Sequence, residues 1–83
     1  MAVNFEKLIQ ELVSPLVVFP EDLLVKKFSE DEDAITLQVL VNKEDLGRVI
    51  GRRGKIANAI RTIAYAAASR IGKRVNIDFD SYE

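Results

Sequence analysis

The chain begins with apolar side chains at the three- and four-residue spacing of an amphipathic helix. They are Phe5, Leu8, Ile9, Leu12 and Val13. Asn4 is a candidate N-cap, and Val3 is placed to pack against Leu8 across the start of this helix. Pro15 ends the pattern because it disfavours helical backbone at the residue before it. The spacing therefore predicts a helix over about 4–13.

Two segments with strand character follow this helix. Pro20-Glu21-Asp22 has the composition of a turn, and it precedes a strand over about 23–29 whose inward face the pattern does not assign. The acidic residues 30–33 predict a solvated hairpin turn. After them every second residue is apolar, as in a strand with one face in a core. These apolar residues are Ile35, Leu37, Val39 and Val41.

A helical period returns after the second strand. Asn42 is predicted to cap a short helix from Lys43 to about Ile50, with Asp45 as its capping-box partner. Two glycines within residues 51–54 then interrupt the helix.

A long helix is predicted next, over 55–71. Its inward face is assigned to Ile56, Ala59, Ile60, Ile63, Ala67 and Ile71. Gly72 is its C-terminal stop. A third strand follows, in which Val75, Ile77 and Phe79 alternate with polar residues.

The predicted order is helix, strand, strand, helix, helix, strand, within one domain of residues 1–83. This order predicts an α+β fold in which a three-stranded sheet is covered on one face by three helices. Because two helices connect the second strand to the third, those strands can lie parallel and make the sheet mixed.

Cysteine and histidine are both absent. Their absence removes disulfides, thiolate and imidazole metal ligands, and the commonest general base. The acidic residues cluster at 30–33, where a hairpin turn accounts for them. We therefore expect no enzymatic activity, no metal ion and no cofactor. The chain also lacks a signal-peptide pattern and an apolar run long enough to cross a bilayer, so we expect a cytoplasmic protein without a membrane contact.

Charge is distributed unevenly along the chain. Residues 1–45 hold four Lys/Arg and ten Asp/Glu, whereas residues 46–74 hold eight Lys/Arg and no acid. Such asymmetry attracts a polyanion to one face and repels it from the other. The alternative reading is a solvated basic helix.

The centre of the basic stretch is the turn Gly51-Arg52-Arg53-Gly54. Glycine lets the backbone turn sharply and approach a ligand closely. The amides at the start of the following helix and the two arginines are predicted to form a phosphate site, with Lys55 beside them. A nucleotide-binding P-loop is excluded, because Val49 stands where that motif requires glycine.

Apolar residues beside the turn are predicted to line a groove for single-stranded RNA, together with one edge of the strand 35–41. They are Val49, Ile50 and Ile56, for which a place in the core is an equal alternative, whereas Ile60 and Ile63 are expected in the core. Further candidate contacts to the RNA backbone are Arg48, Arg61, Lys73 and Arg74. Tyr65 falls opposite the apolar stripe, near Arg61 and Ala68, as a candidate partner contact or an incidental surface residue.

The motif Val49-Ile50-Gly51-Arg52-Arg53-Gly54 resembles the KH signature, and the order of elements is similar to that of the type II KH fold over nearly the whole chain. Residues 44–57, 59–62 and 72–75 resemble the KhpA family of small, single-domain bacterial RNA-binding proteins. One position departs from the general KH pattern, because Ala57 stands where isoleucine is frequent and the bulky aliphatic residue is Ile56. This departure affects the expected groove floor.

The resemblance implies a groove for about four nucleotides whose phosphates lie at residues 51–54. It also implies a homodimer, or a heterodimer with a KH protein of the Jag (KhpB) type. The implied role is in RNA metabolism and post-transcriptional regulation, connected with cell growth, shape and division. The alternative function is a protein-protein interaction module in which RNA binding is secondary.

Overall fold

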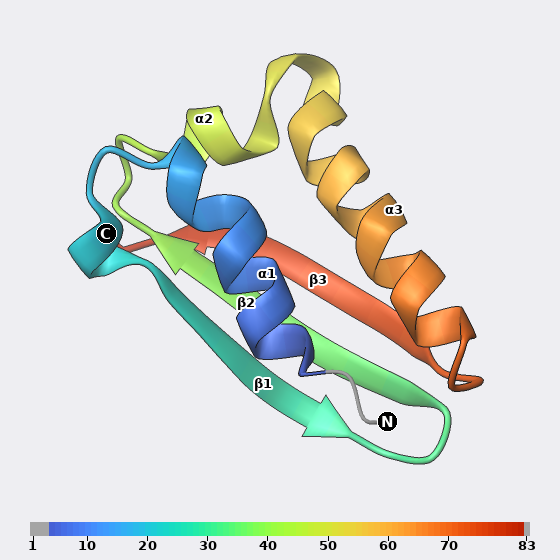
Figure 1. The fold of residues 1–83 in the computed structure, drawn as a ribbon. Helices are drawn as coiled ribbons and strands as arrows, with labels where there is room; N and C mark the ends of the chain where they lie inside the picture. The colour runs from blue at the N-terminus through green and yellow to red at the C-terminus, as the bar shows by residue number, and fades with distance from the viewer. Residues whose placement is uncertain (1–3, 83) are drawn as a thin grey trace.

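The computed structural model describes residues 4–82, which form an α+β fold in the predicted order (Figure 1). The elements are α1 (Phe5–Val13), β1 (Leu24–Glu30), β2 (Ala34–Val41), α2 (Leu46–Ile50), α3 (Lys55–Ser69) and β3 (Arg74–Ser81). Short 3₁₀ turns at Ser14–Leu16 and Pro20–Asp22 occupy the segments where the two prolines predicted an end and a turn. The expected packing of Val3 lies outside the described residues.

The sheet is mixed, as predicted, and its strand order is β1-β2-β3. β1 runs antiparallel to β2, and β3 runs parallel to β2 with Ile35 opposite Val75 and Leu37 opposite Ile77. The parallel pair requires the long crossover through α2 and α3. β2 therefore lies in the centre of the sheet, and β1 and β3 form its edges.

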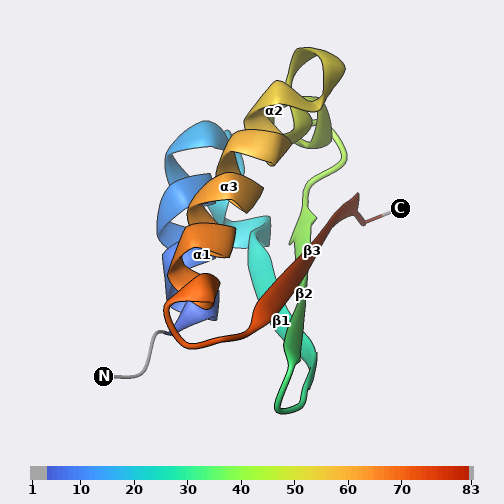
Figure 2. The same cartoon turned by 90° about the vertical axis from the view of Figure 1, so that its right-hand side faces the viewer.

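The helices of residues 4–82 all lie on one face of the sheet, and no helix of this part of the chain lies on the other face (Figure 2). The odd-numbered residues of β2 point to the helices and are buried, as the alternation predicted. The α3 helix runs on from α2 through the 3₁₀ turn Arg52–Gly54, so the two together make one bent helical segment. The sheet is thus covered by α1 and this bent segment, and the predicted count of three separate helices is slightly too high.

The predicted inward face of α3 is partly wrong. Its buried residues are Ala57, Ile60, Ala64 and Ala68, and the helix ends at Ser69, two residues earlier than predicted. Ile63 and Ile71 are 45% and 43% exposed, and Ala59 is also exposed. Three of these four buried residues are alanines, whose small side chains let the helix axis come close to the sheet. The helical period selected the larger apolar residues, so the predicted inward face is rotated about the helix axis relative to the observed one.

The predicted start of α2 is also wrong. Asn42 does not cap a helix at Lys43, because its side-chain oxygen accepts the amide of Glu44 at 2.9 Å and its carbonyl accepts the amide of Asp45 at 2.8 Å. These bonds form a turn over 42–45, and the helix begins at Leu46. No helix within the described residues is long and apolar enough to cross a membrane.

Candidate nucleic-acid interface

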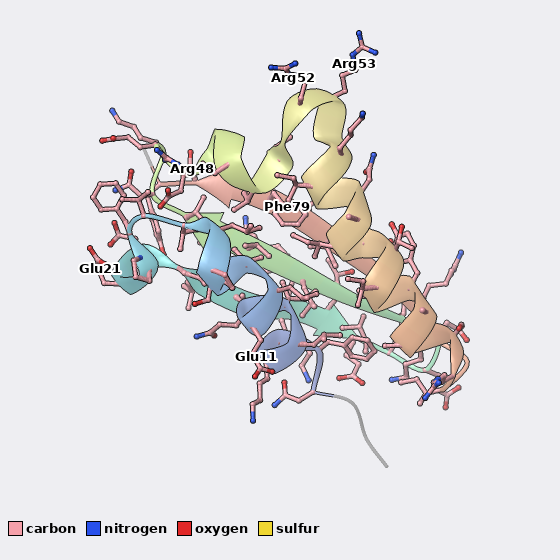
Figure 3. The ribbon with its side chains drawn as sticks, turned by 45° about the horizontal axis from the view of Figure 1, so that its top comes forward. Glu11, Glu21, Arg48, Arg52, Arg53 and Phe79 are labelled. Carbon is pink, nitrogen blue, oxygen red and sulfur yellow. The ribbon has the colours of Figure 1, made fainter. Side chains whose placement is uncertain are left out.

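The turn between α2 and α3 depends on unusual backbone conformations at three of its four residues. Gly51 has φ 76° and ψ 172°, Arg53 has φ 58° and ψ 26°, and Gly54 has φ 75° and ψ 15°. The conformation of Gly51 is essentially restricted to glycine, and Arg53 is the one described non-glycine residue with positive φ. The chain consequently reverses within four residues, and the side chains of Arg52 and Arg53 point away from the fold at its tip (Figure 3).

Hydrogen bonds within the turn change the predicted phosphate site. The amide of Gly54 donates to the Gly51 carbonyl at 3.1 Å, and the amide of Lys55 donates to the Arg52 carbonyl. These two amides at the start of α3 are therefore not free, contrary to the prediction. Among the turn and loop hydrogen bonds of residues 4–82, none is donated by the amides of Arg52 or Arg53. The open donors lie at the tip of the turn.

Arg52, Arg53 and Lys55 concentrate positive charge around these donors. All three are exposed, and the ion pairs found within the described part of the chain involve other residues. A phosphate approaching the tip therefore meets three cations that no carboxylate of the described residues neutralises.

Gly51 packs directly against Ile56. A Cβ atom at Gly51 would lie 2.7 Å from Cγ1 and 2.9 Å from the backbone nitrogen of Ile56. The first turn of α3 thus closes over the glycine, and the aliphatic side chain at this contact is that of Ile56. The small Ala57 is fully buried beneath the helix.

The apolar residues beside the turn divide into core and surface. Val49 is fully buried and belongs to the hydrophobic core, whereas Ile50 and Ile56 are partly exposed at its margin. Of the two residues expected in the core, Ile60 is buried and Ile63 is not.

The prediction that an edge of β2 forms the groove wall is wrong. β2 pairs with β1 on one side and β3 on the other, so it has no open edge. The strand in contact with both α2 and α3 is β3, because the crossover brings the chain back beside β2 on the side of these helices. The strand that lies beside the bent helical segment is therefore β3, and not β2.

Phe79 on β3 and Arg61 on α3 are in contact, and sequence reasoning missed their connection. Phe79 is partly exposed on β3, between α2 and α3 (Figure 3). The guanidinium carbon of Arg61 lies 5.1 Å from the centre of the Phe79 ring. Its Nε and Nη2 donate to the carbonyl of Ile77 at 3.3 and 3.0 Å. Alternation placed Phe79 in the third strand, and it carries no signal for a pairing with α3.

The remaining basic candidates are not gathered at the turn. Arg48 donates to the Glu44 carbonyl at 2.7 Å and to the Asp45 carboxylate at 3.0 Å. Lys73 pairs with Glu30 at 2.7 Å, and Arg74 is exposed at the start of β3. Lys73 and Arg74 follow the C-terminal end of α3, whereas the turn precedes its N-terminal end (Figure 1). Fifteen helical residues separate the two groups.

Tyr65 is 49% exposed on α3, as predicted. Of its expected neighbours, Arg61 is partly exposed but Ala68 is fully buried in the core. Ile63 is exposed to a similar extent on the other side of the helix, since two residues correspond to about 200° of helical rotation.

Asp45 has a structural role that differs from the capping role predicted from the sequence. Its side chain is fully buried, and its two carboxylate oxygens accept the amides of Val18 and Phe19 at 2.9 and 3.0 Å. Burial by itself would raise the pKa of Asp45, but these amides and the Arg48 guanidinium outweigh it and lower the pKa below the usual 3.8. The carboxylate therefore fastens the loop after α1 to the start of α2.

The acidic hairpin is explained by turn chemistry. One carboxylate oxygen of Asp31 accepts the amides of Asp33 and Ala34 at 2.7 and 2.8 Å. Within residues 4–82 no group of three or more carboxylates is arranged to hold a metal ion.

Comparison with known proteins agrees with this geometry. A family model described as KhpA/KhpB, KH domain, matches residues 6–79. The chain belongs to the KhpA/KhpB family of KH domains. The resemblance predicted from the turn motif is thus confirmed, and the family is a non-enzymatic one.

Individual KhpA relatives are similar over most of their length. The protein named RNA-binding protein KhpA of Listeria monocytogenes is 44% identical over 73 residues, which cover 88% of this chain and 95% of that protein. The protein of the same name from Bacillus subtilis is 40% identical over 75 residues, which cover 90% of this chain and 91% of the relative.

The KH fold is also found in a larger protein of known structure. The crystal structure of Era in complex with MgGDPNP and nucleotides 1506–1542 of 16S ribosomal RNA superimposes with a TM-score of 0.65 at 19% identity. The superposition covers 93% of this chain and 29% of the Era chain. At this identity the likeness concerns the fold alone.

Proposed function

We propose that the chain acts as a single KH domain that binds single-stranded RNA, with the RNA phosphates held at the turn Gly51–Gly54. The observation that carries the proposal is the tip of this turn, where the amides of Arg52 and Arg53 donate none of the turn and loop hydrogen bonds of residues 4–82 and both arginine side chains are exposed. Amides and arginines together are the usual donors to phosphate oxygens. The KhpA relatives are themselves named RNA-binding proteins.

The distribution of charge supports binding in one orientation. The bent segment of α2, the turn and α3 contains no acidic residue, whereas the acidic hairpin lies at the far end of the sheet (Figure 1). A strand of RNA is therefore attracted to the turn and repelled from the hairpin.

The apolar margin supports the choice of single-stranded RNA. Ile50, Ile56 and Phe79 are all partly exposed beside the turn. Unstacked bases bury their faces against such side chains, whereas the bases of a duplex are already stacked. We infer a role in RNA metabolism and post-transcriptional regulation, with Arg48, Lys73 and Arg74 as additional candidate contacts to the RNA backbone.

Replacing both arginines of the turn tests the proposal. In Arg52→Gln/Arg53→Asn, the asparagine keeps a side chain that tolerates positive φ, and two charges are removed. We expect affinity for a single-stranded RNA at physiological salt to fall about fifteenfold, and the log-log salt slope to become shallower by about 1.4. Fluorescence anisotropy at several salt concentrations measures both values.

Two matched variants separate the turn from net charge. Arg52→Lys/Arg53→Lys keeps the charge at the turn, and Lys7→Gln/Lys26→Gln removes two exposed charges from α1 and β1. We expect both to bind RNA nearly as the unchanged protein does. If the control at Lys7 and Lys26 weakens binding as much as the variant of the turn, the site is misplaced.

We also propose that α3 binds a second KH domain, either another copy of this chain or a partner of the KhpB type. The family name includes both KhpA and KhpB. A stripe of apolar residues on α3 is partly or largely exposed in the described chain and has the three- and four-residue spacing of a helix-packing surface. The stripe consists of Ile56, Ala59, Ile63 and Ala67. Tyr65 is a predicted contact only for a partner that approaches from the side of β3. An interaction module would use the same stripe even if RNA binding were secondary.

Charge on the stripe is expected to prevent self-association. Because Ile63 is exposed, Ile63→Asp removes an apolar contact without leaving a cavity in the core. We expect the sedimentation coefficient, measured by sedimentation velocity, to change from that of a dimer to that of a monomer. Tyr65→Asp introduces the same charge on the other flank and is expected to disrupt only a complex whose partner approaches from the side of β3. A monomer for the unchanged protein, with no complex formed on adding a KhpB protein, would contradict the proposal.

A further inference from the structure

The open edge of β3 has one carbonyl that is already occupied. Successive residues of a strand direct their backbone groups to opposite edges. The amides of Arg74 and Tyr82 donate toward β2, to the carbonyls of Asp33 and Val41. The backbone N–H and C=O groups of the odd-numbered residues of β3 therefore point away from β2. The Ile77 carbonyl is one of these, and it accepts two hydrogen bonds from Arg61.

Arg61 is held in place by three further elements of its surroundings. Its guanidinium plane lies over the Phe79 ring at 5.1 Å, and its Nη1 donates to the side-chain oxygen of Asn58 at 3.2 Å. Arg61 also projects from the middle of α3, which is itself fixed by the buried residues Ile60 and Ala64. The guanidinium is thus positioned before any ligand arrives.

The position of Arg61 places it along the path of a bound strand. It lies six residues after Lys55, which corresponds to about 9 Å along the helix from the turn. A base that follows the phosphate held at the turn would therefore meet the Ile77 edge and its arginine. Of the five guanidinium N–H groups, three are used by the protein, so two are left for a ligand.

This arrangement changes what the edge can recognise. An open carbonyl at Ile77 would accept a hydrogen bond from an exocyclic amino group, as found on adenine and cytosine. With Arg61 in front of it, the edge presents donors instead, and donors pair with keto oxygens, as arginine pairs with guanine. We propose that Arg61 is a specificity-determining residue that favours uracil and guanine over cytosine and adenine at this position. The inference rests on the proposed RNA-binding function.

A contact to RNA phosphates would behave differently. Arg61 used in that way would strengthen binding to every sequence equally, because phosphates carry no sequence information. The ratio of affinities for two sequences therefore separates base recognition from a backbone contact.

The test compares RNA hexanucleotides that differ at the relevant group. Oligouridine and oligocytidine differ at C4, which carries a keto oxygen or an amino group, and oligoinosine and oligoadenosine differ in the same way at C6. We expect the unchanged protein to bind each keto hexamer about tenfold more tightly than its amino counterpart, the effect of one hydrogen bond to a charged group. Arg61→Ala is expected to reduce both ratios to about one or to invert them.

Arg70→Ala is the matched control, because it removes the same charge from an exposed position after the end of α3. We expect it to weaken all hexamers slightly and to keep both ratios. Arg61→Lys keeps the charge but lacks the planar fork, so it should also lower the ratios and provides a second variant if Arg61→Ala does not fold.

Three outcomes would overturn the inference. Equal binding of keto and amino hexamers by the unchanged protein would do so, as would ratios that survive in both Arg61 variants; RNA binding at the turn would stand in either case. If no hexamer bound the unchanged protein, and the variant of Arg52 and Arg53 were indistinguishable from it, the proposed function itself would fail together with the inference.

Discussion

Gly51→Ala is expected to destabilise the fold by about 3 kcal/mol, from backbone strain and overpacking together. The new methyl group would lie 2.7 Å from Cγ1 and 2.9 Å from the backbone nitrogen of Ile56. The side chain of Ile56 can move, but its backbone nitrogen is fixed in the first turn of α3. Alanine would also have to adopt φ 76° and ψ 172°. Urea unfolding followed by circular dichroism measures the loss.

Gly54→Ala is the matched control for this prediction. Gly54 also has positive φ, at 75°, but the nearest atom to an added Cβ would be Nδ2 of Asn58 at 3.7 Å. Only the left-handed conformation then costs stability, and we expect a loss of about 1 kcal/mol. Equal losses in the two variants would contradict the role of the contact between Gly51 and Ile56.

Asp45→Ala is expected to lower the melting temperature by about 15 °C, because buried donors without an acceptor are costly. The variant leaves the amides of Val18 and Phe19 without their acceptor and Arg48 without its carboxylate. Since these bonds hold the start of α2, we also expect weaker binding of RNA at the turn that α2 leads into. Differential scanning calorimetry measures the first effect and fluorescence anisotropy the second.

Acid supplies an independent measurement of the same interaction. Because the pKa of Asp45 in the fold lies below its usual 3.8, its contribution to stability is complete above that value and is lost as the pH falls through the lowered pKa. Asp45→Asn cannot titrate there, so its melting temperature should fall less between pH 5 and pH 2 than that of the unchanged protein.

Other carboxylates contribute equally to the acid sensitivity of Asp45→Asn and of the unchanged protein, so they do not affect the comparison. Two lysines, Lys27 and Lys73, bond to Glu30 and lower its pKa to about 2, and this group titrates equally in both proteins. Identical acid sensitivity of Asp45→Asn and the unchanged protein would show that Asp45 adds no stability that depends on its charge.

The sequence by itself determined the elements and their order. Helical and strand periods are local properties of the chain, because side chains repeat every 3.6 or two residues whatever lies opposite. Glycine at 51 and 54 likewise predicted the turn, since few other residues adopt its backbone conformations. The mixed sheet followed from the length of the crossover between the second and third strands.

The tertiary structure alone decided which surfaces meet. The inner face of α3 carries three alanines beside Ile60, and these small side chains let the helix lie close to the sheet. Periodicity could not weigh that distance against the size of isoleucine. Asp45 reaches amides 27 and 26 residues away in the chain, and Arg61 reaches the carbonyl of Ile77 across 16 residues. Such partners are set by the packing of whole elements, so no local pattern marks them.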